Sequence, residues 1–223
     1  MIDKLAAYQR IHDIRRKRGV AKLGLMTNQV WADDPKRLVF VLARYKFVAK
    51  MLHGGLKKVL EVGCADAFGT RIVKQHVGFI KAIDLDPLFI EDVKERMDPH
   101  YAIEAQVHDM LTGPIVEDFD AAYSLDVLEH IEPDEQARFV SNIIRSVKRN
   151  GTIIIGTPSL ESQVYASPLS EAGHINCKSG DQLKFELEQH FNNVFIFSMN
   201  DEVVHTGFAP MAHYLLALCC NPK

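Results

Sequence analysis

The stretch Val59–Thr70, with the sequence VLEVGCADAFGT, decides the fold. It opens with a short apolar run, Val59–Val62, which is typical of a strand buried on both faces. Small residues follow, framed by Gly63 and Gly69, and helical spacing then resumes. A strand, a small-residue turn and a helix open a nucleotide-binding α/β unit. The missing side chains let a ligand approach the backbone, and the helix N-terminus offers free N–H groups.

The acidic residues of this stretch argue against a dinucleotide ligand. The pattern G-x-G-x-x-G is absent, and Glu61 and Asp66 would repel a pyrophosphate but suit a cationic ligand. The stretch resembles the glycine-rich first motif of class I S-adenosylmethionine-dependent methyltransferases, an acid followed by G-x-G-x-G, with Ala65 replacing the middle glycine. The resemblance implies that the cofactor is held by Glu61, Gly63, Cys64 and Ala65.

The next predicted strand, Phe79–Ile83, ends at Asp84. An acid about 20 residues past a glycine turn, at the tip of the following strand, is placed to accept both ribose hydroxyls of an adenosine. NAD and S-adenosylmethionine share this ribose, so Asp84 does not distinguish them. Leu85 is assigned to the cofactor site with it.

A third predicted strand, Tyr101–Val107, is followed by two further cofactor candidates. In the methyltransferase pattern, an acid here accepts a hydrogen bond from the adenine amino group, beside an apolar neighbour. The resemblance carries these roles onto Asp109 and Met110. Leu125, at the end of the strand predicted for Ala121–Leu125, completes the predicted cofactor set.

The segment Phe119–Glu132, FDAAYSLDVLEHIE, carries the candidate chemistry. Asp126, Glu129 and His130 share one face if Asp126 opens a helical turn. The segment resembles the post-strand motif of ubiquinone-pathway O-methyltransferases and of small-RNA terminal 2′-O-methyltransferases. In those families an acid-x-x-Glu-His set binds a divalent metal, and the acid is usually a glutamate.

The resemblance therefore implies a metal site made of Asp126, Glu129, His130 and His174, with His174 as fourth ligand or general base. Carboxylates and imidazoles suit Mg²⁺, Mn²⁺ or a similar ion, which would lower the pKa of a substrate hydroxyl. The alternative stays open that no metal binds, because many relatives keep Glu-His without one. Glu129, His130 and His174 are the predicted catalytic residues in either case.

The chain ends with a run at Val194–Phe197 and a long apolar run at Ala212–Cys220, predicted as a terminal antiparallel hairpin. The expected fold is α/β and Rossmann-like: a seven-stranded, mostly parallel sheet with that hairpin and with helices on both faces. A dehydrogenase sheet would continue parallel.

Residues 56–223 are predicted to form the cofactor-binding domain, and residues 1–55 an N-terminal helical cap. The cap is expected to hold a helix at residues 2–18, a linker at 19–34 and a helix starting after Asp34. Its Trp31, Arg37, Arg44 and Tyr45 are candidates to cover the active site, or else ordinary core and surface residues. Residues Lys148–Gly151 are expected to end a helix, and residues 159–173 are expected to form a substrate-holding loop.

Composition narrows the class of protein. The 223 residues carry a net charge of −3, which gives no electrostatic case for nucleic acid. The sequence contains no run of about 18 apolar residues, so no membrane span is predicted. The four cysteines show no metal spacing, and the adjacent pair Cys219 and Cys220 would bridge only with strain, which favours reduced thiols and a cytoplasmic location.

These observations predict an S-adenosylmethionine-dependent O-methyltransferase. Its expected acceptor is a hydroxyl of a small metabolite, for example a sugar or a nucleotide-linked glycan precursor, with or without a metal. The alternatives are an RNA 2′-O-methyltransferase, an NAD-dependent oxidoreductase and a non-catalytic cofactor-binding protein. The sequence leaves the acceptor, the metal and the oligomeric state open.

Overall fold

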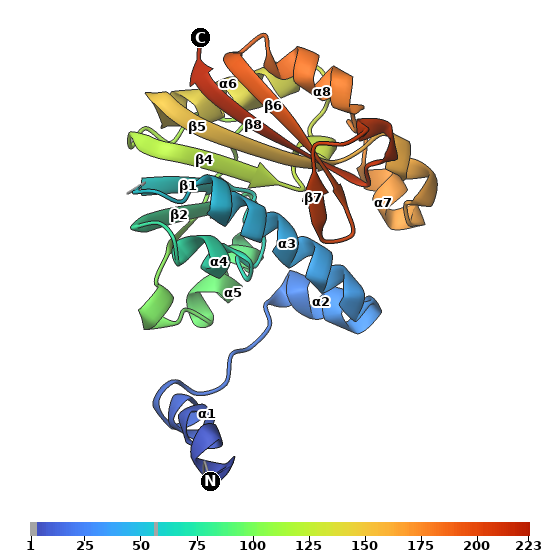
Figure 1. Ribbon diagram of the computed structural model, residues 1–223. Helices are drawn as coiled ribbons and strands as arrows, with labels where there is room; N and C mark the ends of the chain where they lie inside the picture. Colours follow the sequence, from blue (N-terminus) through green and yellow to red (C-terminus); the bar gives the residue numbers. More distant parts are fainter. Residues whose placement is uncertain (1–3, 56–57) are drawn as a thin grey trace.

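The computed structural model describes residues 4–55 and 58–223, which build a central eight-stranded sheet (Figure 1). The strand order is β3-β2-β1-β4-β5-β8-β6-β7. The strands are β1 (Lys58–Val62), β2 (Phe79–Asp84), β3 (Glu104–Val107), β4 (Phe119–Leu125), β5 (Val147–Pro158), β6 (Phe191–Asn200), β7 (Val203–His205) and β8 (Tyr214–Pro222).

The first five strands pair in parallel, whereas β8 pairs antiparallel with both β5 and β6. The predicted fold class is therefore confirmed. The short β7, which pairs with the end of β6, makes the described sheet one strand larger than the predicted seven.

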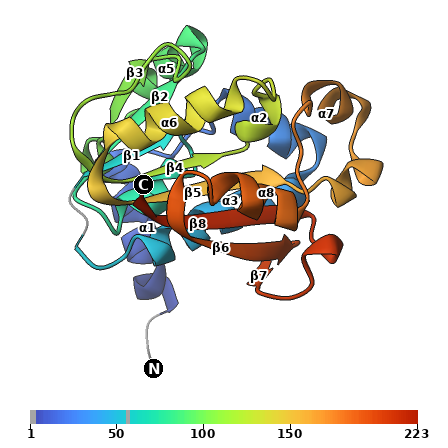
Figure 2. The same cartoon turned by 90° about the horizontal axis from the view of Figure 1, so that it is seen from above.

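Helices cover both faces of the sheet, as predicted (Figures 1 and 2). Buried side chains of α3, α4 and α5 share one core with the sheet. Those of α6 and α8 share a second core on the other face. The helices are α1 (Lys4–Arg18), α2 (Leu25–Asp33), α3 (Pro35–Met51), α4 (Thr70–Lys74), α5 (Pro87–Glu95), α6 (Gln136–Ser146), α7 (Pro168–Gly173) and α8 (Gly180–Leu187).

The sheet places the site because parallel strands end at the same edge. Val62, near the end of β1, pairs with Ile83 of β2 and Ser124 of β4. Each strand is almost wholly buried, so polar groups needed by a ligand gather just beyond the carboxyl ends. Three features therefore lie at one edge of the sheet: the turn that follows Val62, the side chain of Asp84 and the side chain of Asp126.

The N-terminal segment departs from its prediction in one place. Residues Leu25–Asp33, expected to be part of a linker, form α2, and α3 then begins at Pro35 with the Asp34 side chain accepting from Lys36 N, as predicted. The predicted start of the first helix at residues 2 and 3 lies outside the described residues. The helix α1 projects from the body of the molecule (Figure 1).

The division into a cap and a domain at residues 55 and 56 stays a prediction. Val48 of α3 and Leu52, which directly follows this helix, are buried in the core that includes residues of β1 and β2, so the helix packs as part of the main body. Within the described residues, no helix has the length and apolar character needed to cross a membrane.

Two further expectations were wrong. Residues Lys148–Gly151, expected to end a helix, belong to β5, because α6 stops at Ser146 and Val147 pairs with Phe119 of β4. Residues 159–173 are not a plain loop, since they contain the 3₁₀ turn η3 (Glu161–Tyr165) and the helix α7.

Candidate functional site

The turn after β1 is held in a strained conformation. Gly63 has φ +76°, and a Cβ atom there would lie 2.2 Å from Cγ2 of Val127, so any other residue would be strained and would displace Val127. Ala65 and Ala67 also have positive φ, at 45° and 50°. Such angles cost a residue with a Cβ roughly 1–2 kcal/mol, so the surrounding structure must hold this turn in place.

Asp84 is one of the groups that hold it. Its carboxylate accepts from the backbone N–H of Ala65 at 2.8 Å and from that of Asp86 at 3.0 Å. The neighbouring Leu85 side chain is 70% exposed, an uncommon state for a large apolar group. Asp84 and Leu85 thus lie at the surface beside the turn, where a ligand can reach them.

Glu61 is enclosed by the protein instead. It is 2% exposed, and its Oε2 accepts from the Thr70 hydroxyl at 2.6 Å. Burial raises its pKa from 4.5 to about 7, against that hydrogen bond. Cys64 and Leu125 are buried as well, so of these three predicted cofactor residues none has an exposed side chain.

Asp66 performs a task that the sequence did not reveal. Its carboxylate accepts from the backbone N–H of Thr27 at 2.6 Å, from the Thr27 hydroxyl at 3.2 Å and from the N–H of Phe68 at 3.1 Å. It therefore caps the first turn of α2 and is 5% exposed, so it does not face a cationic ligand as expected.

The contact between α2 and the turn is close. A Cβ atom on Gly24, which precedes α2, would lie 2.4 Å from both Asp66 and Arg96. Arg96 donates to the Asp66 carbonyl at 2.6 Å and pairs with Asp92. In addition, Tyr45 of α3 packs directly on Gly69. The segment before β1 thus supports the turn from Gly63 to Gly69.

The predicted adenine contacts occupy different environments. Asp109 is exposed, and its carboxylate accepts from the N–H of Leu111 at 2.8 Å within a turn. Met110 is 4% exposed and belongs to the core beneath α6. Asp109 can reach a ligand, whereas the Met110 side chain is already covered by protein.

Three of the four predicted metal ligands come together. Glu129, His130 and His174 each offer one ligand atom, and these atoms lie within 4.8 Å of one another. Glu129 and His130 lie in the 3₁₀ turn η2 (Leu128–His130) after β4, and His174 directly follows α7. Residues 44 positions apart in sequence thus meet at one point of the edge, and their binding of a metal stays a prediction.

Both imidazoles have their orientation fixed. Nδ1 of His130 lies 2.7 Å from the Gly173 carbonyl, and Nδ1 of His174 lies 2.9 Å from Oε1 of Gln163. A carbonyl oxygen only accepts, so each Nδ1 carries a proton, and in the neutral form of each imidazole the lone pair is therefore on Nε2. Outer hydrogen bonds of this kind are typical of metal-binding or base histidines.

Glu129 completes the cluster from a buried position. It is 1% exposed, and its Oε2 accepts from the Thr157 hydroxyl at 3.3 Å. Burial, followed by the negative charge of Asp126, raises its pKa. Partial burial, together with the neighbouring His130, lowers the pKa of His174. Both shifts favour neutral forms that exchange protons readily.

Asp126 was predicted to be the fourth member of this cluster, but it lies outside the cluster. It has φ +57°, so it does not open a helical turn, and Nη1 of Arg44 donates to both its carboxylate oxygens at 2.5 and 2.6 Å. The Arg44 guanidinium also lies 3.8 Å above the ring of Tyr214. Arg44, a predicted cap candidate, is thus part of the site.

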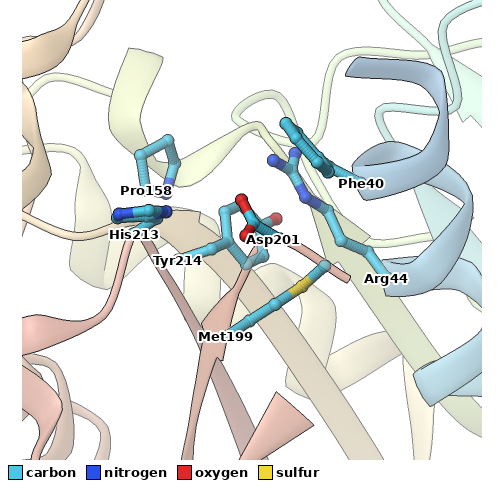
Figure 3. Close-up of a pocket in the computed structure, with 7 residues that line it drawn as sticks. All are labelled: Phe40, Arg44, Pro158, Met199, Asp201, His213 and Tyr214. Carbon is cyan, nitrogen blue, oxygen red and sulfur yellow. The ribbon is translucent and has the colours of Figure 1, made fainter. Parts of the chain in front are cut away.

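A small cavity of about 80 Å³ lies beside this pair (Figure 3). Phe40 and Arg44 from α3 form one side, and Pro158 and His213 the other, with Asp201 and Tyr214 between them. Its lining thus comes from α3, from the ends of β5 and β6 and from the start of β8, with Asp201 and His213 in the connections.

Comparisons with known proteins agree with this architecture. Residues 60–155 match the family model described as a methyltransferase domain. The chain is 29% identical over 139 residues to nodulation protein S of Rhizobium tropici, covering 60% of this chain and 58% of that protein. The match thus spans little more than half of the rhizobial protein's length.

Two solved structures share the fold. The N-methyltransferase NodS of Bradyrhizobium japonicum WM9, in complex with S-adenosyl-L-homocysteine, superposes with a TM-score of 0.61 at 18% identity, covering 86% of this chain and 91% of that one. The DhpI-SAM-HEP complex gives 0.63 at 14% identity, covering 98% and 99%. The fold and the segment matched at residues 60–155 are similar to those of methyltransferases that use S-adenosylmethionine.

Proposed function

We propose that this protein transfers the methyl group of S-adenosylmethionine to a hydroxyl of a small metabolite. One observation supports the proposal: the cluster of Glu129, His130 and His174 begins two residues after a side chain that packs on the predicted cofactor turn. Val127, two residues before Glu129, packs on Gly63 at the start of the turn. A methyl donor held by the turn would therefore face Glu129, His130 and His174.

The cofactor is proposed to lie along the ends of β1 and β2. The backbone from Gly63 to Ala65 would lie against it, Asp84 would accept the ribose hydroxyls, and the exposed Leu85 and Asp109 would meet the adenine. The buried Glu61 would not touch the cofactor; it would help to fix the shape of the turn by accepting the hydrogen bond from Thr70. Since methyl transfer is an in-line displacement, most of the rate would come from positioning the two reactants.

The acceptor hydroxyl must lose its proton as it attacks the methyl group. The free Nε2 atoms of His130 and His174 are oriented bases for that proton, because their Nδ1 protons are held by the Gly173 carbonyl and by Gln163. The lowered pKa of His174 keeps this imidazole neutral at physiological pH.

The same residues fit a divalent metal. Two imidazoles with orienting hydrogen bonds and one carboxylate are donors that Mn²⁺, Zn²⁺ or Fe²⁺ accepts readily, and Mg²⁺ less readily because it prefers oxygen. Glu129, His130 and His174 would hold the ion. Once bound, it would supply charge that lowers the pKa of the acceptor hydroxyl.

Titration calorimetry with MnCl₂ on the purified protein tests the metal independently of activity. We expect binding to the wild type, and loss of it in His130→Ala and His174→Ala. His213→Ala is the matched control, because His213 lies outside the cluster. Full activity in excess EDTA, with no Mn²⁺ heat, would leave the histidines as bases without a metal.

The methyl transfer itself is tested with radiolabelled S-adenosylmethionine and pools of hydroxylated metabolites. His174→Ala is expected to reduce turnover by about 100-fold, the scale of general base catalysis, while binding S-adenosylhomocysteine as the wild type does. Label transfer that survives in both histidine variants would refute the assigned roles.

An amine acceptor is the second candidate, favoured by the similarity to NodS, whose name is that of an N-methyltransferase. An amine attacks in its neutral form, and the same base would take the proton from the corresponding ammonium ion. For RNA the net charge of −3 gives no support. The antiparallel β8 argues against a dehydrogenase. A silent binding protein would show cofactor binding with no transfer to either acceptor type. The cytoplasmic location stays a prediction.

A further inference from the structure

The cavity beside Asp126 has two polar groups that lack partners within the described chain. Nε of Arg44 and the hydroxyl of Tyr214 are both buried, and neither makes a hydrogen bond there. Buried donors without partners cost about 1–3 kcal/mol each, so they are rare in folded proteins. Here both belong to residues that line the same cavity (Figure 3).

The geometry of Arg44 explains why its Nε remains free. Nη1 alone donates to both carboxylate oxygens of Asp126. The opposite edge of the guanidinium, made of Nε and Nη2, is the fork that normally binds a planar or paired acceptor. Arg44 is therefore fixed by Asp126 and by stacking on Tyr214, with a donor edge to spare.

The charges around the cavity select the kind of acceptor. The positive charge of Arg44 is already balanced by Asp126. Among the residues that line the cavity, the carboxylate is that of Asp201, which is exposed. An anionic group entering the cavity would meet Asp201 without a free cation to offset it, whereas a neutral oxygen would not. Phe40 and Met199 add apolar surface for the flat face of a ring.

The size of the cavity limits what enters it. At about 80 Å³ it is far below the roughly 300 Å³ at which complete ligand pockets begin. It therefore holds one edge of a molecule whose remainder lies outside. Pro158 of the lining follows Thr157, which bonds Glu129, so the cavity adjoins the catalytic cluster.

We infer that this cavity is the acceptor's anchoring subsite, and that it takes a neutral hydroxylated ring whose oxygens accept hydrogen bonds from Arg44 and Tyr214. The inference rests on the proposed methyl transfer, since it assigns the substrate of that reaction. The anchored edge lies against α3, which leaves another hydroxyl of the same molecule to reach His130 and His174.

Three acceptor pools with labelled S-adenosylmethionine test the charge selection: neutral methyl glycosides, sugar phosphates and amino sugars. We expect label in the neutral pool at least tenfold above the other two. Preference for sugar phosphates would show that the Arg44 edge binds an anion, and preference for amino sugars that Asp201 binds a cation; either would overturn the assignment.

Tyr214→Phe tests the anchor, because it removes only the buried hydroxyl. We expect the KM for the neutral acceptor to rise about fivefold, the effect of one neutral hydrogen bond, with unchanged affinity for S-adenosylhomocysteine. Tyr8→Phe is the matched control on α1, where the tyrosine is exposed. Arg44→Lys keeps a cation for Asp126 but removes the fork, and should raise the same KM.

The outcomes separate this inference from the proposed function. Wild-type KM in both Tyr214→Phe and Arg44→Lys would refute the anchoring subsite while leaving methyl transfer intact. No label in any pool, from a protein that binds S-adenosylhomocysteine, would refute the assigned acceptor chemistry. A wild-type protein that does not bind S-adenosylhomocysteine would contradict the proposed function itself.

Discussion

Replacing Asp66 by asparagine tests how the N-terminal segment supports the cofactor turn. The carboxylate accepts three hydrogen bonds, two from Thr27 and one from Phe68. An amide offers one accepting oxygen. If that oxygen keeps the 2.6 Å bond to the Thr27 N–H, the new NH₂ group faces the N–H of Phe68, and that bond is lost.

The magnitude follows from this count. Losing one buried hydrogen bond to a charged group costs about 2 kcal/mol, and the remaining bonds weaken because they no longer involve a charge. For a chain of this length, about 2 kcal/mol lowers Tm by about 6 °C. Because Ala65 and Ala67 are strained, the loosened turn should also bind S-adenosylhomocysteine about tenfold more weakly.

The assay pairs thermal unfolding with titration calorimetry of S-adenosylhomocysteine. Thr27→Val should show a smaller loss in both, since it removes only the hydroxyl bond, and Thr27→Ser should restore wild-type values. Asp134→Asn, at an exposed position before α6, is the control for the chemical change. Wild-type Tm together with wild-type affinity in Asp66→Asn would refute the account of α2 as a support of the turn.

Three other results are expected. Gly63→Ala should destabilise the fold by at least about 2 kcal/mol and abolish S-adenosylhomocysteine binding, because φ is +76° and the added methyl group meets Val127; normal binding would contradict this. The raised pKa of Glu61 means that its contribution to stability is complete below pH 4.5 and is lost as pH rises through about 7. Glu61→Gln should therefore flatten the decline in unfolding free energy between pH 5 and 8 by up to about 3 kcal/mol, and an unchanged slope in denaturant titrations would count against the buried acid. Gly69→Ala should weaken cofactor binding by displacing Tyr45, and Tyr45→Ala in the same chain should recover part of it.

Local patterns predicted the elements that depend on local chemistry. β1, its turn, β2 and the start of α3 follow from apolar runs, glycines and an Asp-Pro pair, which act within a few residues. The meeting of Glu129 and His130 with His174 came from the resemblance to metal-using families, because no spacing rule joins residues 44 positions apart.

The missed features depend on contacts between distant residues. α2 lies in a stretch without a capping side chain of its own, since its cap, Asp66, comes 39 residues later. The local motif placed Asp126 among the metal ligands. Its actual partner is Arg44, which lies 82 residues earlier, so the motif could not reveal the ion pair. Likewise, Lys148–Gly151 is polar and turn-like in sequence. These residues belong to β5 because the preceding residue, Val147, pairs with Phe119 of β4.

The central claim is that the turn between Gly63 and Gly69 holds the methyl donor. A crystal structure of the protein with S-adenosylhomocysteine tests it most directly. The account predicts the nucleoside at the carboxyl ends of β1 and β2, with its ribose hydroxyls on Asp84 and its sulfur facing the Glu129, His130 and His174 cluster. A ligand bound elsewhere, or absent at saturating concentration, would contradict it.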